Sequence, residues 1–300
     1  MLCQLYCLSA ARASAPCPRR VEDITEALWG TKVSPGTVSK LNKKIYATIE
    51  GWRNRPIEGS HPYVYLDGIA LKRSWGGEVR TVSVLVAVGV NAEGYREILG
   101  VCEGAKEDKA GWSGFLRHLK ERGLKGVKMF ITDKALGLVE SLGEFYPDAR
   151  WQRCTVHFMR NVLGHVPRGR MREVSAMLKA IYAQEDRAEA MLKAKGVAEK
   201  LRGMKLAGAA KVLEGGAHET LSYYAFPSEH WRRIRTNNPL ERIMKEIRRR
   251  TNVVGSFPDG NSALMLVAAR LRHIAGSRWG LKQYLKIERL EEMNREQSVA

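Results

Sequence analysis

Long apolar runs are absent from this sequence of 300 residues. The longest, Val82–Val90, has the length of one strand, whereas a helix that crosses a bilayer needs roughly 18 apolar residues. We therefore expect no contact with a membrane. The opening segment Met1–Cys17 resembles a secretory leader only in its small residues, because Gln4 interrupts its apolar stretch and no basic residues precede it. A cytoplasmic protein is expected.

The sequence has few cysteines, and its acidic residues are outnumbered by basic ones. The five cysteines are odd in number and three of them crowd into the N-terminus, so we expect no disulfide framework. Acids number 32 against 50 lysines and arginines, which gives a net charge of +18 and favours a polyanionic partner, above all nucleic acid. With 44% hydrophobic residues and no internal repeat, the composition excludes a disordered or fibrous protein.

The stretch 21–55 predicts two helices around a turn, preceded by an atypical segment, 1–20. In the second helix the apolar residues keep helical spacing, at Val38, Leu41, Ile45 and Ile49. Ser34 is placed to cap this helix, and its outer face carries Lys40, Lys43 and Lys44. This outline is typical of a helix-turn-helix whose second helix enters a major groove. A solvated pair of amphipathic helices is the alternative.

Residues 60–154 have the pattern of an α/β domain. Strand-like runs are expected at Tyr63–Asp67, Arg80–Val90, Tyr95–Val101, Val127–Asp133 and, as a short last strand, Arg150–Cys154. The turn residues Asn91–Gly94 predict that the second and third runs form an antiparallel hairpin. Helical patterns lie at Ala110–Arg122 and Leu136–Phe145. We therefore expect a mixed sheet with helices packed against it.

The rest of the chain is predominantly helical. From Thr155 to Tyr224 the residues have helical periodicity and no convincing strand, so a helical insertion, 155–230, interrupts the α/β domain. The second part of that domain, 231–275, is predicted to begin with a long basic helix, continue through a loop at Val254–Asn261 and end with an apolar helix. The last segment, 276–300, is predicted to be a mobile tail.

Two aspartates are placed for chemistry. Asp67 and Asp133 each follow an apolar strand, and acids at the ends of adjacent strands can converge. Such carboxylates repel each other unless a divalent cation lies between them, and Mg²⁺ is commonly held by one or two carboxylates together with phosphate oxygens. The pair therefore indicates a site for a phosphodiester. The alternative is that each aspartate only begins a turn.

A third acid, Glu241, is a candidate ligand of the same site. If Asn238 caps the following helix and Pro239 occupies its first position, Glu241 falls in the first turn. The apolar positions of that helix then form a buried stripe at Leu240, Met244 and Ile247. The alternative is an ordinary surface ion pair of Glu241 with Lys245, in which case Glu246 is an equivalent surface acid.

Positive charge surrounds this third acid. Residues 231–250 contain eight lysines and arginines against two acids, which predicts contact with a phosphate backbone. The expected DNA-binding residues of this segment are Arg235, Arg242, Lys245, Arg248, Arg249 and Arg250.

Several motifs together identify a family resemblance. They are Leu66–Gly68, Glu103–Lys109, Ile131–Asp133, Trp151–His157, Arg235–Arg242 and Arg248–Thr251. From about Val21 to Tyr284, the chain resembles the transposases of bacterial insertion sequences of the mutator type, relatives of plant Mutator transposases. The resemblance implies an α/β, ribonuclease-H-like fold, in which a helical insertion interrupts a mixed sheet. It also implies a location in the bacterial cytoplasm, on the nucleoid.

The resemblance further implies an enzyme with a DDE triad, at Asp67, Asp133 and Glu241. Two Mg²⁺ or Mn²⁺ ions would be bridged by the first acid and flanked by the other two. Such an enzyme cleaves the ends of an insertion sequence and joins them to target DNA by metal-dependent phosphoryl transfer, without a covalent intermediate. Its partners are double-stranded DNA, both transposon ends and target, and further copies of itself on that DNA.

A Cys-x-x-His element at Cys154 and His157 also matches the family. Such spacing can supply half of a zinc site, but no second Cys/His pair follows, so a structural or DNA-positioning role is favoured. Met1–Arg20 differs from the longer region of DNA-binding helices that family members carry. The alternative function is therefore a truncated, non-catalytic DNA-binding remnant that represses transposition.

Overall fold

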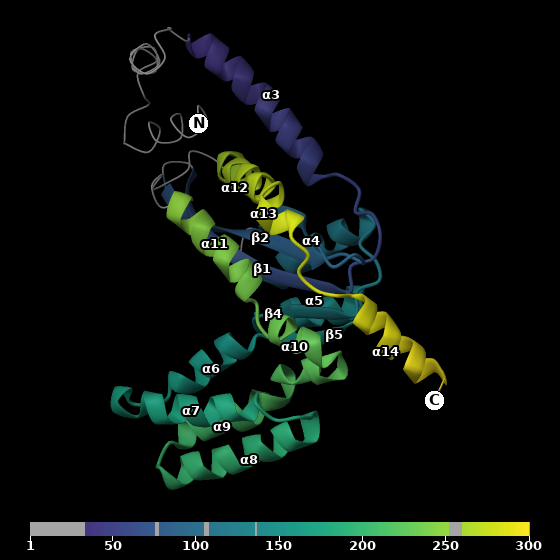
Figure 1. Ribbon diagram of the computed structural model, residues 1–300. Helices are drawn as coiled ribbons and strands as arrows, with labels where there is room; N and C mark the ends of the chain where they lie inside the picture. Colours follow the sequence, from purple (N-terminus) through teal and green to yellow (C-terminus); the bar gives the residue numbers. More distant parts are fainter. Residues whose placement is uncertain (1–33, 76–77, 105–107, 136, 252–259, 300) are drawn as a thin grey trace.

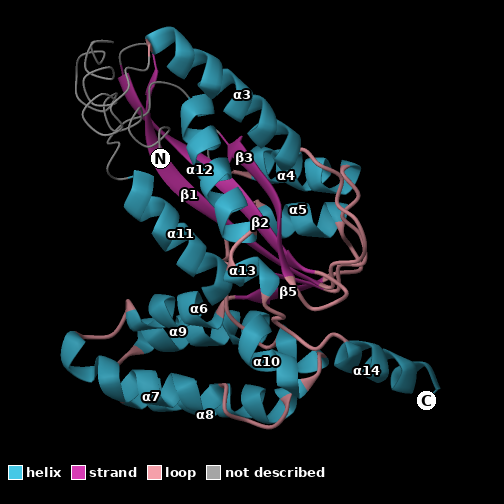
Figure 2. Cartoon of the chain, turned by 45° about the horizontal axis from the view of Figure 1, so that its top comes forward, coloured by secondary structure: helices cyan, strands magenta, loops and turns pink. Residues whose placement is uncertain are grey.

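A five-stranded mixed sheet forms the centre of the protein (Figures 1 and 2). The computed structural model describes residues 34–75, 78–104, 108–135, 137–251 and 260–299. The strands, in the order β3-β2-β1-β4-β5, are β1 (Tyr63–Trp75), β2 (Glu78–Val90), β3 (Arg96–Gly104), β4 (Met129–Thr132) and β5 (Arg150–Arg153). Strand β2 runs antiparallel to both of its neighbours, β1 and β3, whereas β4 and β5 run parallel to β1. The predicted mixed sheet and the β2–β3 hairpin are confirmed.

Alternate side chains of the sheet belong to two separate cores. Tyr63, Tyr65 and Ile69 lie on the face covered by α11 (Asn238–Thr251) and α12 (Gly260–Ala275). Val64 and Leu66 lie on the opposite face, which is covered by α4 (Lys109–Glu121) and α5 (Leu138–Phe145). This alternation follows from the two-residue period of a strand. Asp67 therefore faces the same side as α11.

Strand β1 is longer than predicted, so Asp67 does not end it. The strand continues to Trp75 because its antiparallel partner β2 pairs with it over the whole length, from Tyr63 with Val90 to Trp75 with Glu78. The parallel pairing with β4 is what stops near the acid, since its last pair joins Tyr65 to Ile131. The alternative that Asp67 begins a turn is therefore wrong, because Asp67 and Gly68 are strand residues paired with Val86 and Leu85.

A lobe of helices lies below the sheet in Figure 1. It contains α6 (Thr155–Leu163), α7 (Met171–Ile181), α8 (Arg187–Gly203) and α9 (Ala207–Gly216), followed by 3₁₀ turns up to Ala225. All residues of 155–230 are described, and none of them is in a strand. The two ends of the lobe are joined, because the N–H of Thr155 donates to the carbonyl of Arg235 at 3.0 Å.

The long basic helix does not reach back to Trp231, because the segment 231–250 is divided between two helices. The second of them begins within one residue of the start predicted from Asn238 and Pro239. Helix α10 spans Ser228–Ile234 and α11 begins at Asn238, with Thr236 and Asn237 buried in the break. The carbonyl of Asn237 accepts the N–H groups of Leu240 and Glu241, so the cap lies one residue earlier than the predicted Asn238. Glu241 still falls in the first turn.

The predicted tail packs against the sheet as far as Leu290. It contains α13 (Arg278–Leu281) and α14 (Glu288–Val299). The N–H groups of Tyr284 and Leu285 donate to the carbonyl of Gly94 at 2.7 and 3.2 Å, and three apolar side chains are buried, those of Leu285, Ile287 and Leu290. The guanidinium of Arg96 lies between the rings of Trp279 and Tyr284, 4.5 and 4.6 Å from their centroids.

Of the predicted helix pair in 21–55, the second helix is described as α3 (Pro35–Arg53). Its cap is confirmed, because Oγ of Ser34 accepts the N–H of Thr37 at 3.2 Å. Ile49 is buried, whereas Ile45 is 36% exposed. The first helix of the pair lies outside the described residues. Within the part of the chain that the structure describes, no helix combines the length and the apolarity needed to cross a membrane.

Candidate active site

The register of the parallel strands places three polar residues level with one another. Tyr63 of β1 pairs with Met129 of β4 and the register advances evenly, so Asp67 is level with Asp133 just beyond the paired stretch. In the next pair of strands, Thr132 is level with Arg153, which places Asp133 level with Cys154. The carboxyl ends of β4 and β5 thus bring an acid and a thiol to the edge of the sheet beside Asp67.

The two aspartates are anchored locally by backbone groups. Oδ1 of Asp67 accepts the N–H of Gly68 at 2.9 Å, and Oδ1 of Asp133 accepts the N–H of Lys134 at 2.8 Å. The side chain of Asp133 is 44% exposed, so it is accessible to a ligand. Asp133 is thus in the predicted place, directly after a buried strand.

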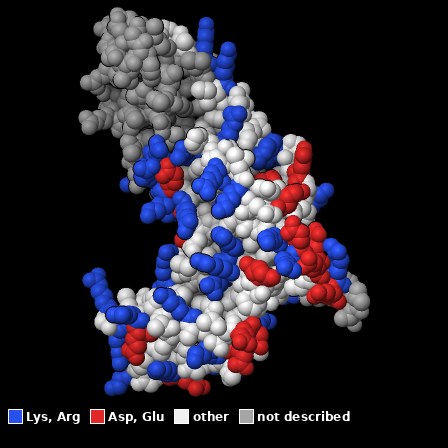
Figure 3. Space-filling view, in the orientation of Figure 1, with Lys and Arg blue, Asp and Glu red and all other residues white. Residues whose placement is uncertain are grey.

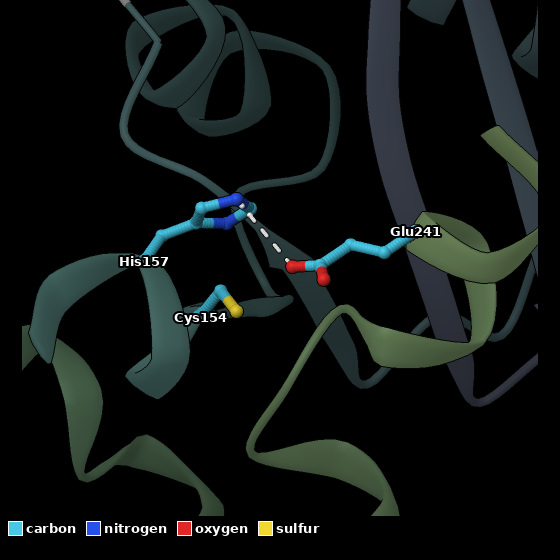
Figure 4. A group of neighbouring side chains, drawn as sticks. All are labelled: Cys154, His157 and Glu241. Atoms are coloured by element: carbon cyan, nitrogen blue, oxygen red, sulfur yellow. Dashed lines mark ion pairs between the residues drawn. The ribbon is translucent and has the colours of Figure 1, made fainter. Parts of the chain in front are cut away.

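The third acid reaches this edge from α11, and its carboxylate faces the ring of His157 (Figure 4). Nε2 of His157, in the first turn of α6, is 3.4 Å from Oε1 of Glu241, and its Nδ1 is 3.9 Å from Oδ2 of Asp133. Both Oε1 of Glu241 and Nδ1 of His157 are buried without a hydrogen-bond partner among the described residues. The 3.4 Å approach is close enough for an ion pair but is not aligned as a hydrogen bond.

Cys154 lies directly before α6 and is fully buried. Its Sγ accepts the N–H of Asn237 at 3.3 Å, and burial raises the pKa of the thiol. Sγ of Cys154, a ring nitrogen of His157 and a carboxylate oxygen of Glu241 all lie within 4.8 Å of one another. The Cys-x-x-His element is therefore part of the same site as the acids.

The helical lobe supplies an ion pair that the sequence did not predict. Glu219, in the 3₁₀ turn after α9, accepts Nζ of Lys134 at 2.5 Å and Nη1 of Arg153 at 2.8 Å. These residues follow Asp133 and precede Cys154, so the lobe contacts both strand ends of the site. No local pattern distinguishes Glu219, because its partners lie far away in the sequence.

A basic surface follows α11 (Figure 3). The exposed residues of this helix include Arg242, Lys245, Arg248 and Arg249. Glu246 is bound by three arginines, with N–O distances of 3.1 Å to Arg249, 3.3 Å to Arg250 and 2.9 Å to Arg270 of α12. Among the other predicted DNA-binding residues, Arg235 donates Nη1 to the carbonyl of Tyr182 at 3.1 Å, whereas Lys40 and Lys44 are exposed on α3. The side chain of Lys43 lies outside the described part.

Comparison with known proteins identifies the family. The family described as "Transposase, Mutator family" matches residues 14–279. The chain belongs to this family. It is 41% identical over 255 residues to the transposase for insertion sequence element IS1081 of Mycobacterium tuberculosis, covering 84% of this chain and 61% of the relative. The predicted resemblance is confirmed.

Other members are more distant. The transposase for ISRM5 of Rhizobium meliloti is 37% identical over 251 residues, covering 84% of this chain and 63% of the relative. The transposase for IS256 in transposon Tn4001 of Staphylococcus aureus is 31% identical over 255 residues, covering 84% and 65%. The chain thus spans about three fifths of the length of the first of these curated relatives.

We expect this member of the Mutator family to hold no stoichiometric zinc at Cys154 and His157. Structural zinc sites are almost always closed by four protein ligands, whereas the cluster among the described residues offers three donors, from Cys154, His157 and Glu241. Metal analysis of protein purified without chelators tests this expectation. One zinc per chain, lost in the Cys154→Ser variant, would contradict it.

Proposed function

We propose that the chain is the catalytic part of a DNA transposase with a ribonuclease-H-like fold, which cleaves insertion-sequence ends and joins them to target DNA. The proposed catalytic residues are Asp67, Asp133 and Glu241. One observation carries the proposal: segments far apart in the sequence bring these acids to one edge of the sheet, where His157 contacts both Asp133 and Glu241. The mixed sheet, interrupted after β5 by a helical lobe, supports the fold assignment.

The proposed triad suits a hard divalent cation. Carboxylate oxygens are the ligands that Mg²⁺ prefers, and Mn²⁺ accepts the same donors. The buried Oε1 of Glu241, which has no hydrogen-bond partner among the described residues, favours such a ligand. Asp67, Asp133 and Glu241 would hold the metal, and we expect two ions at this site. Bound there, it would supply positive charge to the phosphodiester and promote deprotonation of the attacking water or 3′-hydroxyl.

The chain's own side chains would position the DNA. The exposed arginines and Lys245 of α11 continue directly from Glu241, so a phosphate backbone that follows this helix passes the acids. His157 holds the first turn of α6 next to the first turn of α11, which fixes the separation of Asp133 and Glu241. Transposon ends and target DNA are the proposed partners, with further copies of the chain assembled on them.

A direct assay tests the proposed function. The purified chain is incubated with a labelled duplex that carries the inverted repeats flanking its gene, with Mg²⁺ or with a chelator. We expect metal-dependent nicking that leaves a 3′-hydroxyl, followed by joining of that end to a second duplex. Binding without any cleavage, in Mg²⁺ and in Mn²⁺, would contradict the proposal and support a repressor.

The basic surface of α11 gives a prediction about salt. Each phosphate contact that is lost should lower the slope of log K against log salt concentration by about 0.9, so replacing Arg248 and Arg249 together by alanine should lower it by roughly 1.8 at most. Specific and random duplexes should weaken alike, because phosphate contacts carry no sequence information. Titrations at several salt concentrations measure both quantities.

Matched variants sharpen this measurement. Lys193 and Lys195 are exposed on α8, in the lobe away from α11, and replacing both by alanine removes the same charge. The slope should then remain near that of the unmodified chain. By contrast, a change at Lys43 of α3 should alter the preference for terminal-repeat DNA more than the slope, if α3 is a recognition helix. Equal slopes for the α8 and α11 variants would remove α11 from the interface.

A further inference from the structure

Asn237 is fully buried in the break between α10 and α11 and makes three kinds of hydrogen bond. Its side-chain Nδ2 donates to the carbonyl of Leu66 at 3.1 Å, and its backbone N–H donates to Sγ of Cys154 at 3.3 Å. Its carbonyl accepts the N–H of Glu241 at 2.9 Å. A single residue therefore contacts β1, the end of β5 and the first turn of α11.

Each of these contacts adjoins one acid of the proposed triad. Leu66 immediately precedes Asp67 in β1. Cys154 is level with Asp133, and its N–H donates to the carbonyl of Thr132 at 2.8 Å, so it is tied to the end of β4. The third contact is to the backbone of Glu241 itself. The hydrogen bonds of Asn237 thus link the three segments that carry the acids.

The side chain of Asn237 forms a hydrogen bond with the sheet and does not cap its own helix. An asparagine that caps a helix normally accepts an N–H of the first turn with its side-chain oxygen. Here Oδ1 has no hydrogen-bond partner among the described residues, and Nδ2 is directed at β1. The reversed amide would place two acceptor oxygens against each other at Leu66, so the observed orientation is the favourable one. Aspartate and serine are good caps, but an aspartate side chain could not donate this bond.

We propose that Asn237 is a positioning residue that sets the spacing of Asp67, Asp133 and Glu241 for metal and phosphodiester. The inference rests on the proposed function. It adds a role for a residue that touches none of the reacting groups, since its side chain ends on a backbone carbonyl and its backbone bonds hold Cys154 and Glu241 in place. A shift of about 1 Å in such groups can cost on the order of a hundredfold in rate.

The test compares Asn237→Ala with Asn238→Ala, a neighbouring asparagine that is exposed. In Asn237→Ala we expect the cleavage rate at saturating DNA to fall about 10- to 100-fold and the Mg²⁺ concentration for half-maximal rate to rise, while the Kd for DNA stays the same. Binding of Mn²⁺, followed by electron paramagnetic resonance in the absence of DNA, should weaken in parallel. Asn237→Asp should be at least as impaired, because its carboxylate faces the Leu66 carbonyl.

Each outcome decides the matter. An unchanged metal requirement in Asn237→Ala, whether the rate falls or not, would overturn the positioning role and leave a structural one. Should that variant not fold, the variants Cys154→Ala and Cys154→Ser are compared instead. Of these two, only serine keeps an acceptor for the N–H of Asn237, so the serine variant should bind Mn²⁺ more tightly. Equal Mn²⁺ affinities in the two variants would overturn the inference. If the unmodified chain cleaves DNA and Asp67→Asn does not, the proposed function survives either result. An inactive unmodified chain would instead refute that function.

Discussion

Asp67→Asn, Asp133→Asn and Glu241→Gln are each expected to abolish Mg²⁺-dependent cleavage and joining while leaving DNA binding largely intact. Each change removes a metal-binding charge at nearly constant volume. A metal site supplies several kcal/mol of transition-state stabilisation, so a loss of about 4 kcal/mol lowers the rate by about a thousandfold. Gel assays of strand cleavage, with DNA affinity measured separately, check this expectation.

Glu246→Gln is the matched control for Glu241. Glu246 lies in the same helix, but its carboxylate is bound by Arg249, Arg250 and Arg270. We expect this variant to cleave at nearly the rate of the unmodified chain. If Glu246→Gln were inactive and Glu241→Gln active, the assignment of the catalytic face of α11 would be wrong. A triad variant that still joined ends at the normal rate would remove that residue from the site.

Gly94→Ala is expected to destabilise the fold strongly. Gly94 has φ of +82°, and a Cβ there would lie 1.9 Å from the carbonyl oxygen of Leu285. Relieving this clash moves the segment that buries Leu285, Ile287 and Leu290, and each fully buried side chain of this kind contributes about 1.5–3 kcal/mol. We expect the free energy of unfolding to fall by about 3 kcal/mol or more, which lowers Tm by roughly 6 °C or more.

Gly59 provides a control with the same backbone strain. Its φ is +74°, but a Cβ there would meet nothing within 4 Å. Gly59→Ala should therefore lose only the cost of a left-handed residue, about 1–2 kcal/mol. Thermal unfolding and protease sensitivity of residues 276–290 measure the difference. Equal losses of stability in the two variants would mean that this segment does not dock on the β2–β3 turn.

Local signals predicted the parts of the fold that depend on neighbours in the sequence. The turn Asn91–Gly94 joins β2 and β3, Ser34 caps α3, and Glu241 lies in the first turn of its helix. These features depend on backbone dihedrals and hydrogen bonds within a few residues, which residue type largely determines. Asp133 was placed correctly for the same reason, since the short apolar strand before it is buried on both faces.

Long-range pairing explains what the sequence could not predict. Strand β1 continues past Asp67 because β2 pairs with it along its full length. The local pattern places the start of α11 within one residue, but it does not reveal the buried contacts of Asn237 with Leu66 and Cys154. Glu219 reaches Lys134 and Arg153 only after the helical lobe has packed against the sheet. In each case the stabilising partner is distant, so no window of neighbouring residues reveals it.

The bond between Thr155 and Arg235 has a consequence for biosynthesis. The chain must close a loop of about 80 residues before this bond forms, and contacts of such long sequence separation are made late in folding. Glu241 follows that loop, so it is synthesised after both aspartates and after the whole helical lobe. A partly synthesised chain therefore carries two of the three proposed acids and an open site. On the proposed assignment of the triad, a chain whose synthesis stops before Glu241 would lack the third metal ligand and would not cleave DNA.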